Sequence, residues 1–183
     1  MLRNSSDGVW GERKKYRLSL TTSTPDEIEN LLIEKFVGGF PVVLSSGRGA
    51  IKFIVQEFWP AKEISIFQYA SQCVVEAIQA AAVTPYSRIN FTSEIIYNQW
   101  GELDLGCQVT PFMEDSCDTF LPEGSSVLQH GAQFEIWSLP KILHSRFGAI
   151  AWCRNSEDAM SLRKIRDNSK KGNVKKQILR NTH

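Results

Sequence analysis

This chain lacks several features that would assign it to a membrane, secreted or metal-binding class. No apolar run among its 183 residues approaches the roughly 20 residues that cross a bilayer. The first 17 residues contain no apolar segment typical of a secretory signal, so we expect a cytoplasmic location and no membrane partner. The four cysteines are widely spaced and form no C-x-x-C pair, and the three histidines show no ligand spacing. These absences disfavour a zinc site and favour cysteines that remain buried thiols.

The composition is that of one globular domain. Hydrophobic residues make up 42% and charged residues 22%, and the length is sufficient for a sizeable core. The charge is uneven, because residues 161–183 carry eight lysines and arginines against one acidic residue, Asp167. Such a tail could touch nucleic acid or anionic lipid, but a solvated helix is the simpler interpretation, and we regard nucleic acid as an unlikely partner.

Helical and strand patterns alternate along the chain. Thr24, Pro25 and Glu27 form a helix-start signal with a capping box, and Ser156 is a candidate N-cap of a later amphipathic helix. Apolar periodicity predicts further helices over about 49–59 and 71–82, and strands over 41–44, 63–67, 93–98, 110–115, 133–137 and 148–153. This alternation predicts an α/β fold with a mixed, mostly parallel sheet between layers of helices.

Three local features could carry chemistry, and each has a plainer alternative. The small-residue turn over 45–50 would present backbone N–H groups at a helix N-terminus, which is an anion site, although glycines are common in such turns. Asp115 ends an apolar stretch and would lie at the carboxyl edge of the sheet, or simply cap a turn. Lys141 precedes a predicted buried strand and could be a nucleophile or an ordinary surface lysine.

The order of these features resembles that of fold-type-I enzymes that use pyridoxal 5′-phosphate (PLP), and in particular the large domain of the DegT-type sugar aminotransferases. "VVLSSGRGAI" is similar to the phosphate turn of that family, "YASQCVVEAIQAAAVTP" to its next helix, and "IIYNQWG" to a following strand and turn. "FMEDSCDTF" resembles the segment with the cofactor aspartate, and "EIWSLPKILHSRFGAIAWC" the segment with the cofactor lysine. The similar stretches are collinear over residues 18–168.

The resemblance implies a PLP cofactor and a role for each matched residue. Lys141 would be the Schiff-base lysine that forms the internal aldimine and later moves the substrate α-proton, and Asp115 would face the pyridine nitrogen. Tyr69 would stack on the ring, and Ser138 would be an additional phosphate donor. The phosphate turn would consist of Ser46, Gly47, Arg48 and Gly49.

The sequence also departs from the family pattern. Arg48 stands where relatives have a small hydroxyl residue, Ser71 occupies the usual position of the stacking aromatic, and Ile136 occupies that of the phosphate-binding serine. The C-terminal small domain of the family is expected to be missing. We therefore expect an N-terminal arm over 1–17, a PLP-transferase-like large domain over 18–168 and a basic tail over 169–183.

Three functional hypotheses follow. The first is a DegT-type aminotransferase that moves an amino group from an amino-acid donor to a keto-sugar on a nucleotide carrier. The second is a degenerate, non-catalytic relative that acts as a partner or regulatory subunit, and the third is a nucleic-acid-binding module that uses the basic tail. Fold-type-I enzymes build their sites at a two-fold interface, so the resemblance also implies a homodimer.

Overall fold

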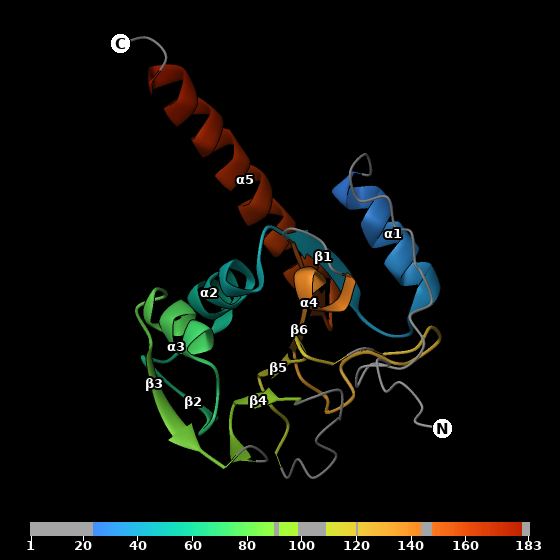
Figure 1. Ribbon diagram of the computed structural model, residues 1–183, viewed down its shortest axis with the longest axis vertical. Helices are drawn as coiled ribbons and strands as arrows, with labels where there is room; N and C mark the ends of the chain where they lie inside the picture. The colour runs from blue at the N-terminus through green and yellow to red at the C-terminus, as the bar shows by residue number, and fades with distance from the viewer. Residues whose placement is uncertain (1–23, 90–91, 99–108, 120, 144–147, 181–183) are drawn as a thin grey trace, which may run out of the picture.

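A computed structural model describes residues 24–89, 92–98, 109–119, 121–143 and 148–180 of the chain. The predicted arm over 1–17, the segment 99–108, and Arg146 and Phe147 near the predicted lysine lie outside these residues. Figure 1 shows the described elements along the chain. They are α1 (Pro25–Lys35), β1 (Phe40–Leu44), α2 (Gly47–Phe58), β2 (Glu63–Phe67), α3 (Gln72–Gln79), β3 (Thr84–Arg88), β4 (Ile95–Tyr97), β5 (Met113–Asp115), β6 (Phe134–Ser138), α4 (Leu139–Leu143), β7 (Ala149–Cys153) and α5 (Ser156–Arg180).

The described strands form one mixed sheet in the order β1-β7-β6-β5-β4-β2-β3. The neighbours from β6 to β3 are parallel, whereas β7 runs antiparallel to both β6 and β1. The prediction of a mixed, mostly parallel sheet is confirmed. Because the parallel strands all end at one edge, the residues that follow β2, β4, β5 and β6 gather there.

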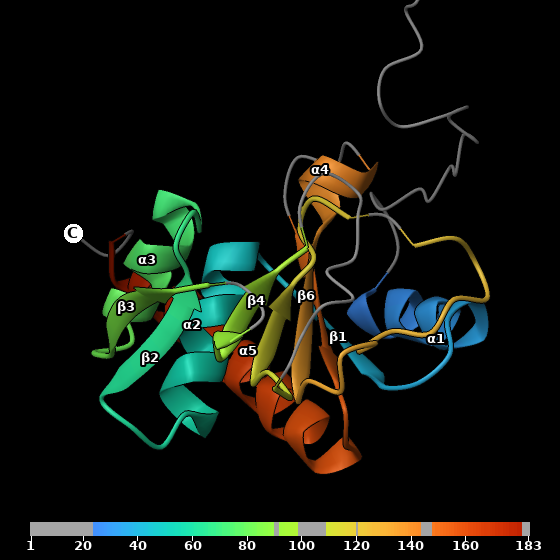
Figure 2. The ribbon, with the colours of Figure 1, turned by 90° about the horizontal axis from the view of Figure 1, so that it is seen from below.

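Helices cover both faces of the sheet, which gives the predicted three-layer arrangement (Figure 2). On one face, α2, α3 and α5 pack on a core of apolar side chains that includes Ile54, Ile64 and Phe134. On the other face, α1 packs over β1, and Phe36 at its end lies edge-on against Trp137 and Trp152, with ring centroids 4.9 and 6.0 Å apart. The sheet is therefore buried by helices on both sides near its β1–β7–β6 half.

Alternation along β5 and β6 sends their side chains to opposite faces. Met113 and Phe134 enter the core under α2, whereas Glu114 and Glu135, which are paired across the two strands, point to the α1 side. Both glutamates are buried, and both find partners there. Glu114 accepts from the backbone N–H and ring Nδ1 of His130, at 3.2 and 2.7 Å. Glu135 accepts from Leu128 N–H and Trp137 Nε1, at 2.6 and 2.7 Å.

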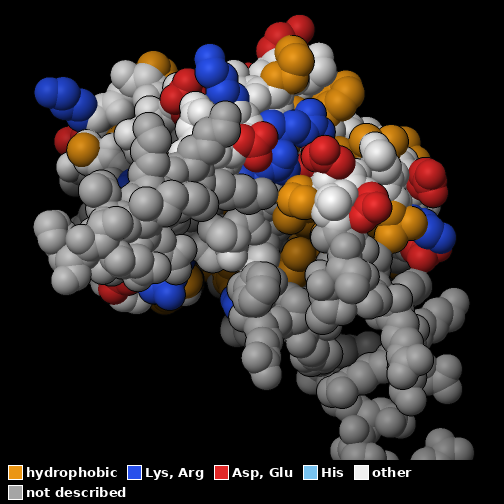
Figure 3. All heavy atoms as spheres, turned by 90° about the horizontal axis from the view of Figure 1, so that it is seen from above, with side chains coloured by type: hydrophobic (Ala, Val, Ile, Leu, Met, Phe, Trp, Pro, Cys, Tyr) orange, Lys and Arg blue, Asp and Glu red, His pale blue; other side chains and the backbone are white. Residues whose placement is uncertain are grey.

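Helix α1 is attached to the body by a carboxylate. Glu29 is 3% exposed and accepts the backbone N–H of Val43 at 2.9 Å. It also accepts Arg163 Nε and Arg166 Nη1 of α5, both at 2.7 Å. On the face seen in Figure 3, basic and acidic described side chains lie beside one another. Glu29 thereby joins α1, β1 and α5, which are far apart in the sequence.

The elements agree with the sequence prediction in most places. The capping box of α1 is present, since Thr24 Oγ1 accepts Glu27 N–H and Glu27 Oε2 accepts Thr24 N–H. Three details differ. The edge strand β3 and the short helix α4 were not predicted, and α2 begins at Gly47 rather than near Gly49. Pro85 explains why β3 was not predicted. Proline has no N–H to donate and is tolerated on an edge strand, but in a sequence it argues against a strand.

Helix α5 differs from the prediction at its start. The prediction that Ser156 is the N-cap is wrong, because Ser156 is already helical and Asn155 Oδ1 accepts the N–H of Asp158 at 2.9 Å. An asparagine accepts this bond as well as a serine does. The helix continues without a break to Arg180 and extends away from the sheet (Figure 1).

Candidate functional site

A cavity of about 280 Å³ opens at the carboxyl edge of the sheet. It brings together six of the predicted site residues, namely Ser46, Gly47, Arg48, Asp115, Ser138 and Lys141. The remaining lining residues are Ser45, Ile51, Ser71, Cys73, Val74, Tyr97, Cys117, Pro140 and Gly148. These residues come from the ends of β1, β4, β5 and β6 and from the starts of α2, α3 and α4.

The turn from β1 into α2 forms one wall of the cavity. Ser46 is the N-cap of α2, and its Oγ accepts the backbone N–H of Gly49 at 3.1 Å. The N–H groups of Gly47 and Arg48, in the same first turn, have no acceptor within the helix, and the helix dipole adds positive potential at this end. The turn therefore suits an anion, as the sequence predicted.

Asp115 is the last residue of β5 and reaches the cavity from the centre of the sheet. It is 3% exposed, and its Oδ1 accepts the backbone N–H of Cys117 at 3.1 Å. Burial raises the pKa of this carboxyl, while the Cys117 hydrogen bonds and the charge of Lys141 act in the opposite direction. A carboxylate in this position gains from a positively charged or N–H-bearing group placed in the cavity.

Lys141 stands in the short helix α4, directly after β6. Its Nζ lies 2.8 Å from Asp118 Oδ1, and the two side chains are 51% and 23% exposed. Burial lowers the pKa of the Lys141 ammonium, but the hydrogen bond and charge of Asp118 outweigh it, so that the net shift is upward. The lysine is thus a cation at the cavity wall rather than a free amine.

Gly148 closes the wall between Ser138 and the phosphate turn. Its φ is +111°, and a Cβ there would lie 2.9 Å from Leu139 Cδ1, so that a side chain would clash. Its N–H donates to Ser45 O at 3.0 Å, and its carbonyl accepts Leu139 N–H at 3.2 Å. The glycine therefore ties the Lys141 segment to the turn before α2.

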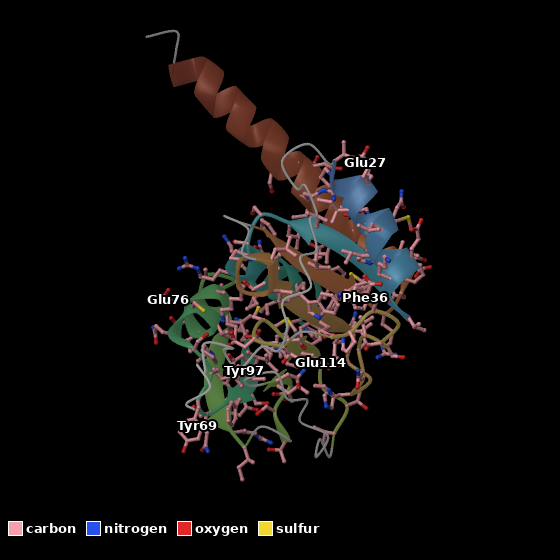
Figure 4. All side chains as sticks on the ribbon, turned by 45° about the vertical axis from the view of Figure 1, so that its right-hand side comes forward. Glu27, Phe36, Tyr69, Glu76, Tyr97 and Glu114 are labelled. Atoms are coloured by element: carbon pink, nitrogen blue, oxygen red, sulfur yellow. The ribbon has the colours of Figure 1, made fainter. Side chains whose placement is uncertain are left out.

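Two predicted residues do not line the cavity. Gly49 lies in the first turn of α2, but its N–H is already bound by Ser46 Oγ. Tyr69 is 72% exposed and packs edge-on against Phe67, with ring centroids 5.4 Å apart. The turn closed by Ala70 N–H on Phe67 O directs it outward, and Figure 4 shows it at the periphery while Tyr97 lies nearer the centre.

Sequence reasoning missed Tyr97 and Asp118. Tyr97 ends β4 and lines the cavity, and its position at a parallel strand end was the available signal. Asp118 lies three residues after Asp115, and the acidic stretch "MEDSCD" was visible, but its partner Lys141 is 23 residues further on. Cys117 was assigned only as a buried thiol, which it is, and burial raises the pKa of that thiol well above its usual range.

The described part of the chain contains no cluster of three or more potential metal ligands. Its helices also include none with the length and apolar character that a bilayer span requires.

Comparison with known proteins shows the family and the fold of the chain. Residues 33–182 match the model of a family described as "Putative PLP-dependent aminotransferase". No curated protein matches the sequence.

Three similar solved structures illustrate the fold. PseC of Helicobacter pylori, an aminotransferase of pseudoaminic acid biosynthesis, is 14% identical, has a TM-score of 0.60, and is matched over 77% of this chain and 48% of its own. NtdA of Bacillus subtilis, with bound cofactor PMP, is 18% identical with a TM-score of 0.57, over 75% of this chain and 39% of its own. Apo CalE6 of Micromonospora echinospora, a methionine gamma lyase, is 15% identical with a TM-score of 0.59. The match covers 79% of this chain and 48% of CalE6.

The matched region therefore has the fold of these PLP enzymes and spans less than half of their length. The family match covers the turn before α2, the aspartate that ends β5 and the lysine after β6. On that match the chain belongs to the family of PLP-dependent aminotransferases.

Proposed function

We propose that this chain binds PLP covalently through Lys141 and acts as an aminotransferase of the DegT type. The observation that carries the proposal is that one cavity joins an anion-binding helix start, a buried carboxylate and a lysine. These three groups come from residues 46–48, 115 and 141, so that only the tertiary fold brings them together.

The described residues suit the three polar ends of PLP. The first turn of α2 offers N–H groups and the Ser46 hydroxyl to a phosphate, and Arg48 adds a cation at the rim. Asp115 offers a carboxylate to a protonated pyridine nitrogen, which would relieve the cost of its burial. Lys141 offers the amine that a carbonyl requires.

Each residue then has a definite task. PLP supplies an electron sink when it is bound. Asp115 would hold a proton at the ring nitrogen, and the turn before α2 would hold the phosphate end. Lys141 would attach the cofactor through Nζ and would take and return the substrate α-proton. Tyr97, which ends β4 at the cavity, is placed to contact the ring in place of the outward-facing Tyr69.

The substrate and the assembly belong to the same proposal. The DegT resemblance and the similarity to PseC favour a keto-sugar on a nucleotide carrier as acceptor, and an amino acid, usually glutamate, as donor. We also propose a cytoplasmic homodimer with an isologous interface. Light scattering at micromolar concentration tests the dimer, and a monodisperse monomer would contradict it.

Borohydride trapping tests the proposed cofactor attachment. Purified protein is mixed with PLP, its visible spectrum is recorded, and it is reduced and digested for mass spectrometry. We expect a phosphopyridoxyl group on Lys141, and the Lys141→Ala variant should lose both the absorbance and the adduct. Modification spread over the lysines of α5, or equal modification of the variant, would rule the attachment out.

A non-catalytic relative is the second candidate. One observation favours it, namely the ion pair of Lys141 with Asp118. Glutamate added to the PLP-loaded protein distinguishes the two. Conversion of the bound cofactor to its amine form supports the aminotransferase, whereas trapping of Lys141 without conversion supports the non-catalytic relative.

A further inference from the structure

The turn that carries Asp118 is fixed to the sheet from two sides. Thr119 N–H donates to Ser116 O at 3.1 Å, which closes the turn directly after β5. Ser116 N–H donates to Ile136 O of β6 at 3.0 Å. The backbone that bears Asp118 is therefore an extension of the β5–β6 pairing.

Asn98 adds a second attachment from β4. It is fully buried, and its Nδ2 donates to Ser116 Oγ at 2.8 Å. The backbone carbonyl oxygen of Asn98 accepts Thr119 Oγ1–H at 3.0 Å, and the backbone N–H of Asn98 donates to Asp115 O at 3.0 Å. Since both ends of the turn are held by buried hydrogen bonds, the position of Asp118 is set by the fold.

The Asp118–Lys141 pair differs from the ordinary surface pair that this chain also contains. Lys35 and Glu123 are 3.1 Å apart with side chains 43% and 41% exposed, whereas Asp118 is 23% exposed and lies 2.8 Å from Lys141, which is itself 51% exposed. A carboxylate that is partly withdrawn from water is screened less than an exposed one. The charge of Asp118 should therefore act on Lys141 more than the charge of Glu123 acts on Lys35.

We propose that Asp118 is a positioning residue that keeps the Lys141 amine protonated and directed at the cavity, so that opening of this ion pair controls when Lys141 can attack a carbonyl. The inference rests on the proposed function, because control of the Lys141 amine matters only if that amine reacts with an aldehyde. The ion pair itself exists independently of any cofactor.

The chemistry explains why the pair matters. An ammonium has no lone pair, so Nζ must first lose a proton, for which Asp118 Oδ1 is the nearest acceptor. The nitrogen lone pair then forms a C–N bond with the carbonyl carbon. The two protons that remain on Nζ pass to the carbonyl oxygen, its bond to carbon breaks, and it leaves as water. The upward shift in the Lys141 pKa has the direction that an anionic Asp118 requires.

Other titratable and charged groups of the described cavity contribute less. Asp115 and the Cys117 thiol lie at the end of β5 and raise the pKa of Lys141 less than Asp118 does. Across the cavity stand Arg48 of α2, Cys73 of α3 and Tyr97 of β4. Arg48 has its own carboxylate, Glu76, 3.9 Å away. Asp118 is therefore the group whose removal should change Lys141.

Competitive acetylation of the ligand-free protein tests the inference without any cofactor. Protein is labelled with trace acetic anhydride from pH 6 to 11, and the Lys141 peptide is quantified by mass spectrometry. We expect Asp118→Asn to move the Lys141 labelling midpoint to lower pH, with labelling at pH 8 faster by about tenfold. Asp118→Glu, which keeps the charge, should restore most of the wild-type profile.

Lys164 in the same digest is the internal control, and Glu123→Gln with its partner Lys35 is the matched control pair, for which little change is expected. Thermal melting checks that the variants fold, and Asp118→Ser replaces Asp118→Asn if Asp118→Asn does not fold.

A Lys141 labelling midpoint that stays at its wild-type pH in a folded variant without the Asp118 charge would overturn the inference. An equal shift in Asp118→Glu would also overturn it, because charge would then be irrelevant. A shifted midpoint in a protein that still fails to bind PLP supports the role of Asp118 and contradicts only the proposed function.

Discussion

Strands β5 and β6 carry carboxyl side chains on both faces of the sheet, and the surroundings of these side chains differ between the two faces. On the α1 side, Glu114 and Glu135 are sealed in and their oxygens are taken by His130, Leu128 and Trp137. On the α2 side, Asp115 is equally buried but opens on the cavity and has Lys141 close enough to influence its pKa. Burial alone does not distinguish Asp115 from the two glutamates, whereas the open space beside it does.

The largest expected effect contrasts Asp115 with Glu114, its immediate neighbour on the other face. Asp115→Asn should lower half-transamination with glutamate by at least about a hundredfold, because an amide cannot stabilise a protonated pyridine nitrogen. The fold should survive, since asparagine keeps an oxygen for the Cys117 N–H. The loss of cofactor absorbance after addition of glutamate measures the rate.

Glu114→Gln is the matched control. It should cost about 1–3 kcal/mol in the free energy of unfolding, because one of the two His130 bonds loses its acceptor. Borohydride trapping on Lys141 should persist. Equal loss of turnover in both variants would show that the two faces do not differ in function.

The next largest expected effect is the loss of stability when the ion pairs of Glu29 with α5 are broken. Glu29→Gln should lower the free energy of unfolding by about 3 kcal/mol, because it removes the buried counter-charge that Arg163 and Arg166 share and leaves Arg166 with the exposed carboxylates of Asp167 and Asp26. Urea unfolding measures this change. Glu123→Gln, which breaks the exposed pair with Lys35, should cost less than about 1 kcal/mol.

A smaller effect concerns pH. Burial, with the charge of Glu114, raises the pKa of Glu135 above its ordinary value of 4.5. The folded state therefore retains the Glu135 proton to higher pH than the unfolded state does. The stability that this group contributes is complete below pH 4.5 and is lost as pH rises through the folded pKa.

Glu135→Gln removes this titration. The variant should be less stable than wild type by about 1–3 kcal/mol at low pH, because glutamine has one acceptor oxygen for two N–H donors. Its deficit should shrink as pH rises above 4.5. Urea unfolding at pH 5 and pH 8 measures the two deficits, and a deficit that grows toward pH 8 would contradict the assigned direction.

The smallest expected effect separates the cap of α2 from that of α1. Ser46→Ala should cost about 1 kcal/mol of stability, because the Gly49 N–H loses its acceptor, and should also weaken PLP binding at the cavity. Thr24→Ala removes a comparable cap on α1, which does not line the cavity. It should cost a similar amount of stability and leave PLP binding unchanged, as titration of the cofactor absorbance would reveal.

Local patterns predicted much of the fold because the interactions that define them are local. The capping box of Thr24 and Glu27 spans four residues, and apolar periodicity marked α2 and the buried strands. The edge strand β3 escaped because it contains Pro85 and is almost wholly exposed, so that it carries no apolar alternation. The cap of α5 was placed one residue too late, since asparagine and serine are both good caps and stand side by side.

The sequence by itself determined the order of the site residues, namely the turn before α2, the aspartate that ends β5 and the lysine that follows β6. Only the tertiary structure decided which of their neighbours reach the same cavity. It turned Tyr69 outward through a local turn, and it placed Tyr97 at the cavity and Asp118 beside Lys141 through the parallel alignment of β4, β5 and β6. The physical reason is that strand ends distant in the sequence meet at one edge of a parallel sheet, and pairing between strands, rather than spacing along the chain, sets those distances.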